Sequence, residues 1–220
     1  RDPYNAKLIR VVSGDPNPEG PGLIEEDIKS NFSGTYPSRR QTINLGSYVR
    51  IPSNKLLNPS KGFTVGATIW PTKIDINDQC IISQFNSTQD AGMSLFVGPK
   101  GVSVIVADGQ KKITRLSIDT RISERRWYHI WATFDPELEK LAIYQTPVID
   151  SFDLDCPRQK EISCSIRPRL TPEQPLIIGA AGNKKITNCF NGKIERPFFI
   201  NEAVNEKDTL DIAKGNNDPR

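Results

Sequence analysis

The chain has 220 residues, of which 36% are hydrophobic and 25% charged, and its formal net charge is +3. A chain of this size and composition can bury one sizeable hydrophobic core. It holds no apolar run near the roughly 20 residues that a membrane helix needs, and its net charge is too small to argue for nucleic acid. We therefore expect neither a membrane nor a nucleic acid as partner.

The cysteines and the first residues bear on the setting of the chain. The four cysteines are Cys80, Cys156, Cys164 and Cys189. They form no C-x-x-C pair, which argues against a zinc site, and reduced thiols are expected, with a Cys156–Cys164 bridge across a loop as the alternative. The chain begins at Arg1 without a start methionine or a signal peptide. We expect a cytoplasmic segment of a longer protein, whose residues 216–220 form a frayed tail or a linker to a missing C-terminal domain.

The N-terminal part, residues 1–52, contains short apolar runs around an irregular loop. Three strands are predicted here, at residues 7–12, 23–30 and 47–51. The loop at residues 15–22 carries three prolines and two glycines, a composition that excludes regular structure. A turn is predicted at residues 33–37. We expect residues 1–52 to belong to the same sandwich as the sequence that follows.

From residue 63 onward, short apolar and alternating runs recur at close spacing. Seven strands are predicted, at residues 63–70, 80–85, 93–97, 102–106, 113–118, 127–134 and 140–144. Turn signals such as Asp108-Gly109 separate them. Many short strands at roughly 8–12-residue spacing are typical of a β-sandwich or barrel. Residues 127–134 carry apolar bulk on both faces, as expected for a strand in the middle of a two-sheet sandwich.

The C-terminal third departs from this rhythm and then returns to it. Residues 149–173 are predicted to form a long excursion loop, and strands follow at residues 175–179 and 190–200. A helix is predicted from the N-cap Asn205 to Gly215, with acidic residues in its first turn. The fold class expected for residues 53–215 is therefore all-β: a two-sheet jelly-roll sandwich with a short C-terminal helix.

A set of landmarks in fixed order supports that fold class. They are Phe63-Thr64-Val65 leading to Trp70-Pro71, Ile81-Ile82-Ser83-Gln84, Met93-Ser94-Leu95-Phe96, the strand Trp127-Tyr128-His129-Ile130-Trp131-Ala132-Thr133-Phe134-Asp135, Leu176-Ile177-Ile178-Gly179 and Phe190-Asn191-Gly192. Each motif is weak alone, but their order resembles the laminin-G-like, concanavalin A-like family. That resemblance implies a jelly-roll sandwich.

The N-terminal block resembles a narrower family. Ala6 to Asp15 runs into Asn17-Pro18-Glu19-Gly20-Pro21-Gly22 and then Glu25-Glu26, which is similar to the stretch preceding the laminin-G-like domain in large subunits of the N,N-dimethylformamidase family. The resemblance implies an amidohydrolase that cleaves N-substituted formamides to formate and an amine. It also implies a mononuclear iron held by tyrosine and glutamate side chains in a region C-terminal to this domain. Ser13 stands where a histidine often occurs in that family.

The histidine and several acidic residues could have either a chemical or a structural role. His129 is the only histidine and is expected to be a satisfied, buried residue rather than the base of a catalytic triad. Glu137, Glu139 and Glu195 could form a glycosidase pair only if two of them faced one another. Asp75, Asp78 and Asp90 are weak candidates for a calcium site, since that ion prefers carboxylate and carbonyl oxygens. No catalytic or cofactor-binding residue is assigned within the chain.

The expected function is that of a non-catalytic accessory domain of a dimethylformamidase-like amidohydrolase, with iron in the missing catalytic domain. Its partners would be that catalytic domain and other subunits. The candidate interface residues lie in two loops and are Asp15, Asn17, Glu19, Cys156 and Cys164. One alternative is a carbohydrate-binding, lectin-like module that uses Trp70, Trp127 and Trp131 as a stacking platform. Another is a free-standing hydrolase.

Overall fold

The computed structural model describes residues 2–38, 46–54, 57–75, 77–149, 156–169, 174–182 and 185–216. The chain divides into two compact units, Arg1–Asn44 and Leu45–Arg220. The larger unit contains two sheets of six and five strands, and the strands of the smaller unit form two-stranded sheets.

The first sheet of the larger unit has six strands in the order β10–β9–β8–β7–β14–β5. Their bounds are β5 (Val49–Ile51), β7 (Gln79–Asn86), β8 (Ala91–Gly98), β9 (Gly101–Asp108), β10 (Ile113–Ser117) and β14 (Leu176–Ile178). All pairings are antiparallel. The consecutive strands β7 to β10 form a meander, because the chain turns tightly at Gly98–Gly101 and at Asp108-Gly109.

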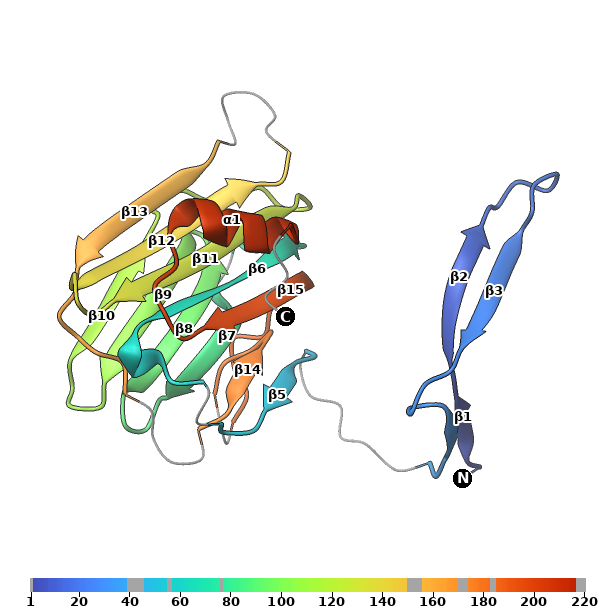
Figure 1. Cartoon of the computed structure of the whole chain (residues 1–220), viewed down its shortest axis with the longest axis horizontal. Helices are drawn as coiled ribbons and strands as arrows, with labels where there is room; N and C mark the ends of the chain where they lie inside the picture. The colour runs from blue at the N-terminus through green and yellow to red at the C-terminus, as the bar shows by residue number, and fades with distance from the viewer. Residues whose placement is uncertain are drawn as a thin grey trace. The chain divides into compact units, whose positions relative to one another are not determined.

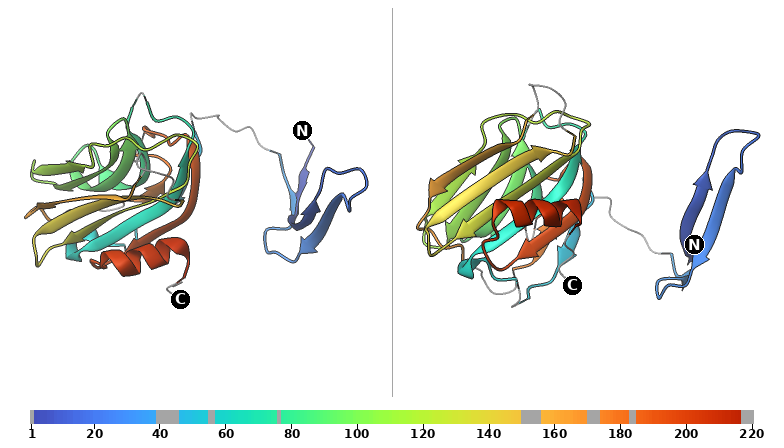
Figure 2. Two further views of the ribbon diagram at one scale, coloured as in Figure 1. Left: turned by 90° about the horizontal axis from the view of Figure 1, so that it is seen from above. Right: turned by 45° about the horizontal axis from the view of Figure 1, so that its top comes forward.

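The second sheet has five strands in the order β13–β12–β11–β6–β15. Their bounds are β6 (Phe63–Pro71), β11 (Tyr128–Asp135), β12 (Lys140–Pro147), β13 (Arg158–Ser163) and β15 (Gly192–Ile200). A short 3₁₀ turn, Pro59–Lys61, precedes β6. The two sheets lie face to face as two layers (Figures 1 and 2). This is the all-β, two-sheet jelly roll that the sequence predicted, and the strands expected between residues 63 and 144 are all present.

The hydrophobic core lies between the two sheets, and alternation along β11 shows how it is built. Tyr128, Ile130, Ala132 and Phe134 belong to the main core cluster, whereas Trp131 belongs to a second cluster with Ala142 and Tyr144. Successive side chains of a strand point to opposite faces. The expectation that both faces of this strand carry apolar bulk is therefore confirmed.

Helix α1 (Glu206–Lys214) covers the second cluster on the outer face of the five-stranded sheet (Figure 1). Its N-cap is Asn205, whose side chain accepts a hydrogen bond from the Asp208 N–H at 3.0 Å. Gly215 ends the helix in the left-handed conformation, with φ of 79°, which a residue without Cβ adopts at no steric cost. The predicted helix, its N-cap and its terminal glycine are confirmed.

Strand β13 (Arg158–Ser163) lies where the sequence predicted no strand. Residues 149–173 were expected to form an excursion loop, but β13 lies within them and pairs with β12 from Lys140↔Ser163 to Gln145↔Arg158. The strand is polar because it forms one edge of its sheet, and Ile162 is its single apolar side chain packed on the core. Residues 150–155 and 170–173 lie outside the described part of the chain.

The smaller unit is a ribbon of short antiparallel pairs. Strand β2 (Leu8–Gly14) pairs with β3 (Leu23–Ile28), and β1 (Tyr4–Ala6) pairs with β4 (Gly34–Tyr36). The second pair was not predicted: β4 lies in the turn expected at residues 33–37, and β1 precedes the strand expected at residues 7–12. It is held by the stacked rings of Tyr4 and Tyr36, whose centroids are 5.7 Å apart, and by a 2.7 Å hydrogen bond from the Thr35 hydroxyl to Asn5.

The unit boundary differs from the predicted one. Of the described strands within residues 1–52, β5 pairs with β14 in the six-stranded sheet and adds Ile51 to the core, whereas β1 to β4 occupy two-stranded sheets. The structure therefore places the boundary at Asn44/Leu45 rather than after residue 52. Residues 39–45 and 217–220, the latter within the predicted tail, lie outside the described residues.

Candidate functional site

His129 lies on the outer face of β11, close to the end of helix α1. It is 5% exposed, and its Nδ1 hydrogen-bonds with the Thr68 hydroxyl at 2.8 Å. Burial and then the cations of Lys214 and Arg196 lower its pKa, against a smaller opposing effect of Glu195. The neutral imidazole is thus favoured. The position agrees with a satisfied, buried histidine rather than with a catalytic base.

The three glutamates considered for a glycosidase pair do not meet. Glu137 and Glu139 lie in the turn between β11 and β12, while Glu195 lies in β15 and pairs with Thr68 of β6. Thr68 in turn lies opposite His129, six residues before the end of β11. At roughly 3.3 Å per strand residue, this places Glu195 about 20 Å from the turn. Hydrolytic carboxylate pairs need roughly 5–9.5 Å.

The tryptophans do not form an open stacking platform. Trp131 is fully buried under helix α1, where its ring stacks on Tyr144 with centroids 4.7 Å apart. The Lys193 ammonium lies 4.9 Å from the centroid of the Trp70 ring. The carbohydrate-binding alternative therefore loses the Trp131 ring, whereas Trp70 and Trp127 are half-buried.

The calcium candidates lie at opposite ends of β7. Asp90 is in the turn after this strand, whereas Asp75 and Asp78 precede it and line a cavity of about 580 Å³. The eight residues of β7 span more than roughly 20 Å, so one ion cannot bind all three. Asp75 pairs with Lys73 at 3.8 Å, and Asp78 pairs with Arg115. The prediction of one calcium site made of these three carboxylates is therefore wrong.

The interface candidates of the N-terminal loop form hydrogen bonds within the loop itself. The Asp15 carboxylate accepts the Asn17 N–H at 2.9 Å, and the Asn17 side chain accepts the Glu19 N–H at 3.2 Å. A Cβ on Gly20 would lie 2.0 Å from an Asp15 oxygen, so the loop closes tightly over this glycine. The side chains of Asp15 and Asn17 thus shape the loop, and Glu19 is exposed.

The two cysteines proposed for the interface lie in different environments. Cys156 is exposed, whereas Cys164 is 3% exposed and belongs to the main core cluster. Both are free thiols, and the Cys164 thiol donates to the Ile166 carbonyl at 3.7 Å. The bridge between them is not formed, and Cys164 is a core residue rather than an interface residue.

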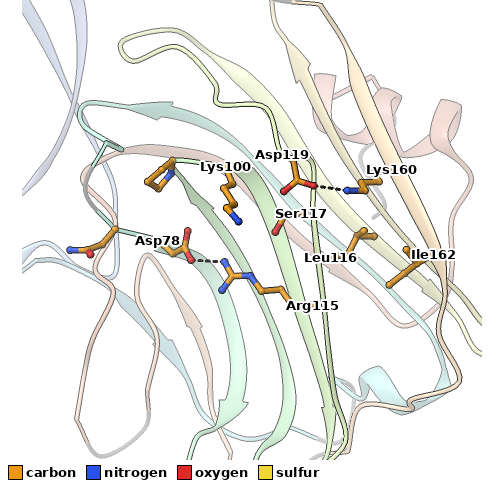
Figure 3. A pocket seen from close by; sticks show the side chains of 10 residues that line it. Asp78, Lys100, Arg115, Leu116, Ser117, Asp119, Lys160 and Ile162 are labelled. Carbon is orange, nitrogen blue, oxygen red and sulfur yellow. Dashed lines mark hydrogen bonds and ion pairs between the residues drawn. The ribbon is translucent and has the colours of Figure 1, made fainter.

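A polar cavity of about 710 Å³ opens where edge strand β10 of one sheet approaches edge strand β13 of the other (Figure 3). Residues from several segments line it: Asn77, Asp78, Pro99, Lys100, Arg115, Leu116, Ser117, Asp119, Lys160 and Ile162. Lys100 is placed by the tight β8–β9 turn. Gly101 there has φ of 75°, and a Cβ on it would lie 2.0 Å from the Thr120 carbonyl oxygen. The turn therefore requires glycine at this position.

Two ion pairs flank the cavity. The Arg115 guanidinium pairs with Asp78 and also donates to the Ser103 hydroxyl at 3.0 Å, and the Lys160 ammonium donates to Asp119 at 2.5 Å. The Lys160 hydrogen bond, with a smaller contribution from the charge of Lys100, holds the pKa of Asp119 below its usual range. Figure 3 shows Lys100 reaching between the two pairs.

Sequence reasoning selected only Asp78 of these charged lining residues. Lys100, Arg115 and Asp119 are separated by turns and a strand, and Lys160 lies in the segment expected to be a loop. They meet because β9 pairs with β10 and β12 with β13. The turn Gly98-Pro99-Lys100-Gly101 was the one local signal. It marks a tight hairpin, and it does not reveal what lies beside the hairpin.

The described residues also bear on a metal or a membrane as partner. No three or more His, Cys, Asp or Glu side chains among them lie close enough together to hold a metal ion. The described residues therefore contain no cluster of His, Cys, Asp or Glu that fits a metal centre. No helix in that part of the chain has the length and hydrophobicity to cross a membrane.

Comparison with known proteins adds sequence relatives. Residues 44–147 match the Concanavalin A-like lectin/glucanases superfamily, Laminin_G_3. An N,N-dimethylformamidase beta subunit from Alcaligenes sp is 30% identical over 230 residues, covering 98% of this chain and 30% of the relative. One from Paracoccus aminophilus is 28% identical, covering 96% and 30%. The chain thus spans about 30% of the length of these curated relatives.

Solved structures share the fold at low sequence identity. A heptameric SAP-like pentraxin from Limulus polyphemus has a TM-score of 0.54 and 17% identity, covering 78% of each chain. A Ruminococcus gnavus IT-sialidase CBM40 bound to α2,3 sialyllactose has a TM-score of 0.57 and 11% identity, covering 79% of this chain and 97% of the other. Residues 44–147 are thus similar to the concanavalin A-like, laminin-G-like family, and almost the whole chain is similar to one part of the N,N-dimethylformamidase beta subunits.

Proposed function

We propose that this chain is a non-catalytic accessory domain of a dimethylformamidase-like amidohydrolase, in which residues outside these 220 hydrolyse the formamide C–N bond. The similarity to beta subunits over nearly the whole chain supports this assignment, together with the 30% share of their length that it spans. The single histidine is enclosed and hydrogen-bonded by Thr68, so it is poorly placed for attack on a substrate. The iron implied by the resemblance would be held by the remainder of the subunit.

The observation that carries an accessory, docking role is the apolar surface of the N-terminal unit that its own strands leave exposed. Its exposed large hydrophobic side chains are Tyr4, Leu8, Val11, Val12, Leu23, Ile24, Ile28, Phe32 and Tyr36. A two-stranded ribbon is at best marginally stable by itself in water. Exposed apolar surface on this scale typically marks a surface that binds another protein segment.

The occupant that we assign to this surface is the remainder of the same subunit. The relatives contain more than twice as much sequence outside the matched part as within it, so a large polypeptide is available for docking. The two strands of the ribbon pair from Leu8↔Ile28 to Gly14↔Leu23, and across them Lys7 pairs with Asp27 at 3.1 Å and Arg10 with Glu26 at 3.8 Å. Docking would stabilise this marginal pairing by burying its apolar side chains.

A matched pair of substitutions tests the docking surface in the full-length subunit. Leu23 in β3 is 68% exposed, and Leu138 in the β11–β12 turn is 72% exposed. If Leu23 is buried on docking, Leu23→Ser removes about 1.5–3 kcal/mol of burial, and the β2–β3 amides should exchange hydrogen at least tenfold faster. Leu138→Ser should leave that exchange unchanged. Equal exchange in both variants and in the parent would contradict the docking role.

A separate assay tests the enzymatic assignment. The full-length protein and the 220-residue chain are compared for iron content and for formate release from N,N-dimethylformamide. We expect both iron and turnover in the full-length protein alone. Turnover by the 220-residue chain would overturn its non-catalytic role, whereas a full-length protein that binds iron but leaves N,N-dimethylformamide intact would refute the substrate and retain the accessory role.

A further inference from the structure

The cavity between β10 and β13 presents more hydrogen-bond donors than its own carboxylates use. A guanidinium has five N–H donors and an ammonium three. The hydrogen bonds described for Arg115 use only Nη2, which leaves Nε and Nη1, and Lys160 gives one hydrogen bond to Asp119. Among the described residues, no hydrogen bond or ion pair involves the Lys100 ammonium, and this side chain is exposed. All three cationic side chains line the same cavity.

The carboxylates that line the cavity keep the cations in place. Asp78 and Asp119 anchor Arg115 and Lys160 from opposite sides, and Lys100 enters between them from a glycine-bounded turn (Figure 3). Groups fixed before binding lose little conformational entropy when a ligand arrives. The apolar side chains of Leu116 and Ile162 complete the lining. A volume of about 710 Å³ falls within the usual range of small-molecule sites.

We propose that this cavity binds a small hydroxylated carboxylate, with the anionic group held by Lys100 and Arg115. Three cationic and two anionic side chains line the space, so its lining carries one net positive charge. One excess charge suits a monovalent carboxylate, because a phosphate dianion would also face the two aspartates at close range. The Arg115 Nη1 and the Lys100 ammonium can each donate to one oxygen of a carboxylate. Ser117 and Asp119 offer hydrogen-bond partners to ligand hydroxyl groups.

The site is independent of the proposed docking role, since it lies wholly within the larger unit and uses none of the apolar side chains of the ribbon. The test is an NMR titration of the 220-residue chain with three probes: glucuronate, glucose and inorganic phosphate. Glucuronate should give saturable shifts of the backbone amides of Lys100, Ser117 and Lys160, with a dissociation constant of about 1 mM or tighter. Glucose should produce none, and phosphate should bind more weakly than glucuronate.

Two variants with the same charge change separate a built site from general surface electrostatics. Lys100→Gln removes the free ammonium, and loss of a charge-assisted contact should weaken glucuronate binding at least about tenfold. Lys207→Gln removes a lysine from the exposed face of α1 and should bind like the parent. Unsaturable shifts with glucuronate, equal weakening in both variants, or tighter binding of phosphate would each overturn the proposal. Amide spectra that match the parent outside the β8–β9 turn show that Lys100→Gln is folded.

Discussion

Mild acid should destabilise this protein through one residue, His129. Only histidine among the side chains has an ordinary pKa between pH 5 and 8, and this chain has one. Folding lowers the pKa of His129, because it is buried and the cations of Lys214 on α1 and Arg196 on β15 oppose its protonation, with Glu195 partly compensating. The unfolded chain therefore binds a proton that the folded chain resists. Stability is fully present above about pH 6.5 and is lost as the pH falls toward the folded pKa.

The size of this loss has an upper limit set by one proton. Stability can fall by at most about 1.4 kcal/mol for each pH unit below 6.5. Urea unfolding at pH 7.5, 6.5 and 5.5 measures it, and about three quarters of the loss should lie between the two lower values, because the unfolded histidine is half protonated near pH 6.5. His129→Gln should abolish that slope while the cations of Lys214 and Arg196 remain. An unchanged slope in His129→Gln, or a parent equally stable at pH 6.5 and 5.5, would refute the assignment.

Substitutions at three further residues test the packing by urea unfolding. Trp131→Ala removes a fully buried ring stacked on Tyr144 and should lower the free energy of unfolding by about 3–5 kcal/mol. Trp131→Phe should lower it by less than about 2 kcal/mol, because the indole N–H is buried without a hydrogen-bond partner. Equal losses of stability in the two variants would contradict this. Gly92→Ala should lower the free energy of unfolding by more than about 2 kcal/mol, since φ is 113° and the new Cβ would lie 1.9 Å from the Gln84 carbonyl oxygen. An unchanged free energy of unfolding would show that the strand relaxes around the added methyl group. Asn205→Ala should cost about 1 kcal/mol by removing the cap of α1, and an unchanged midpoint would show that solvent replaces the cap.

The sandwich could be predicted from the sequence where burial sets the pattern. Phe63 to Ile69 and Tyr128 to Phe134 alternate because every second side chain enters the core. Asn205 and Gly215 mark the ends of α1 by local chemistry that needs no tertiary information. In each of these cases the physical cause lies within a few residues of the signal, so one sequence is enough to find it.

The elements that were missed depend on neighbours distant in sequence. Strand β13 contributes one core residue, Ile162, and otherwise exposes polar side chains along a sheet edge. Its polarity therefore resembles that of a loop until β12 is known to lie beside it. Similarly, Thr35 and Tyr36 read as turn residues, and they form a strand because Asn5 and Tyr4 lie opposite.

The same reasoning explains why the candidate site was the least predictable part. Lys100 lies in the β8–β9 turn of one sheet and Lys160 in β13 of the other, 60 positions away in the sequence. Neither stands in a motif that reveals its ligand. A shared fold does not supply the answer either, because a pentraxin and a CBM40 resemble this domain at 17% and 11% identity. Such neighbours share the two-sheet core, which fixes where strand edges and turns lie, while the side chains on those edges are free to differ. The function of this domain therefore has to be sought in the edge residues, where Lys100, Arg115 and Lys160 converge, and in the apolar ribbon.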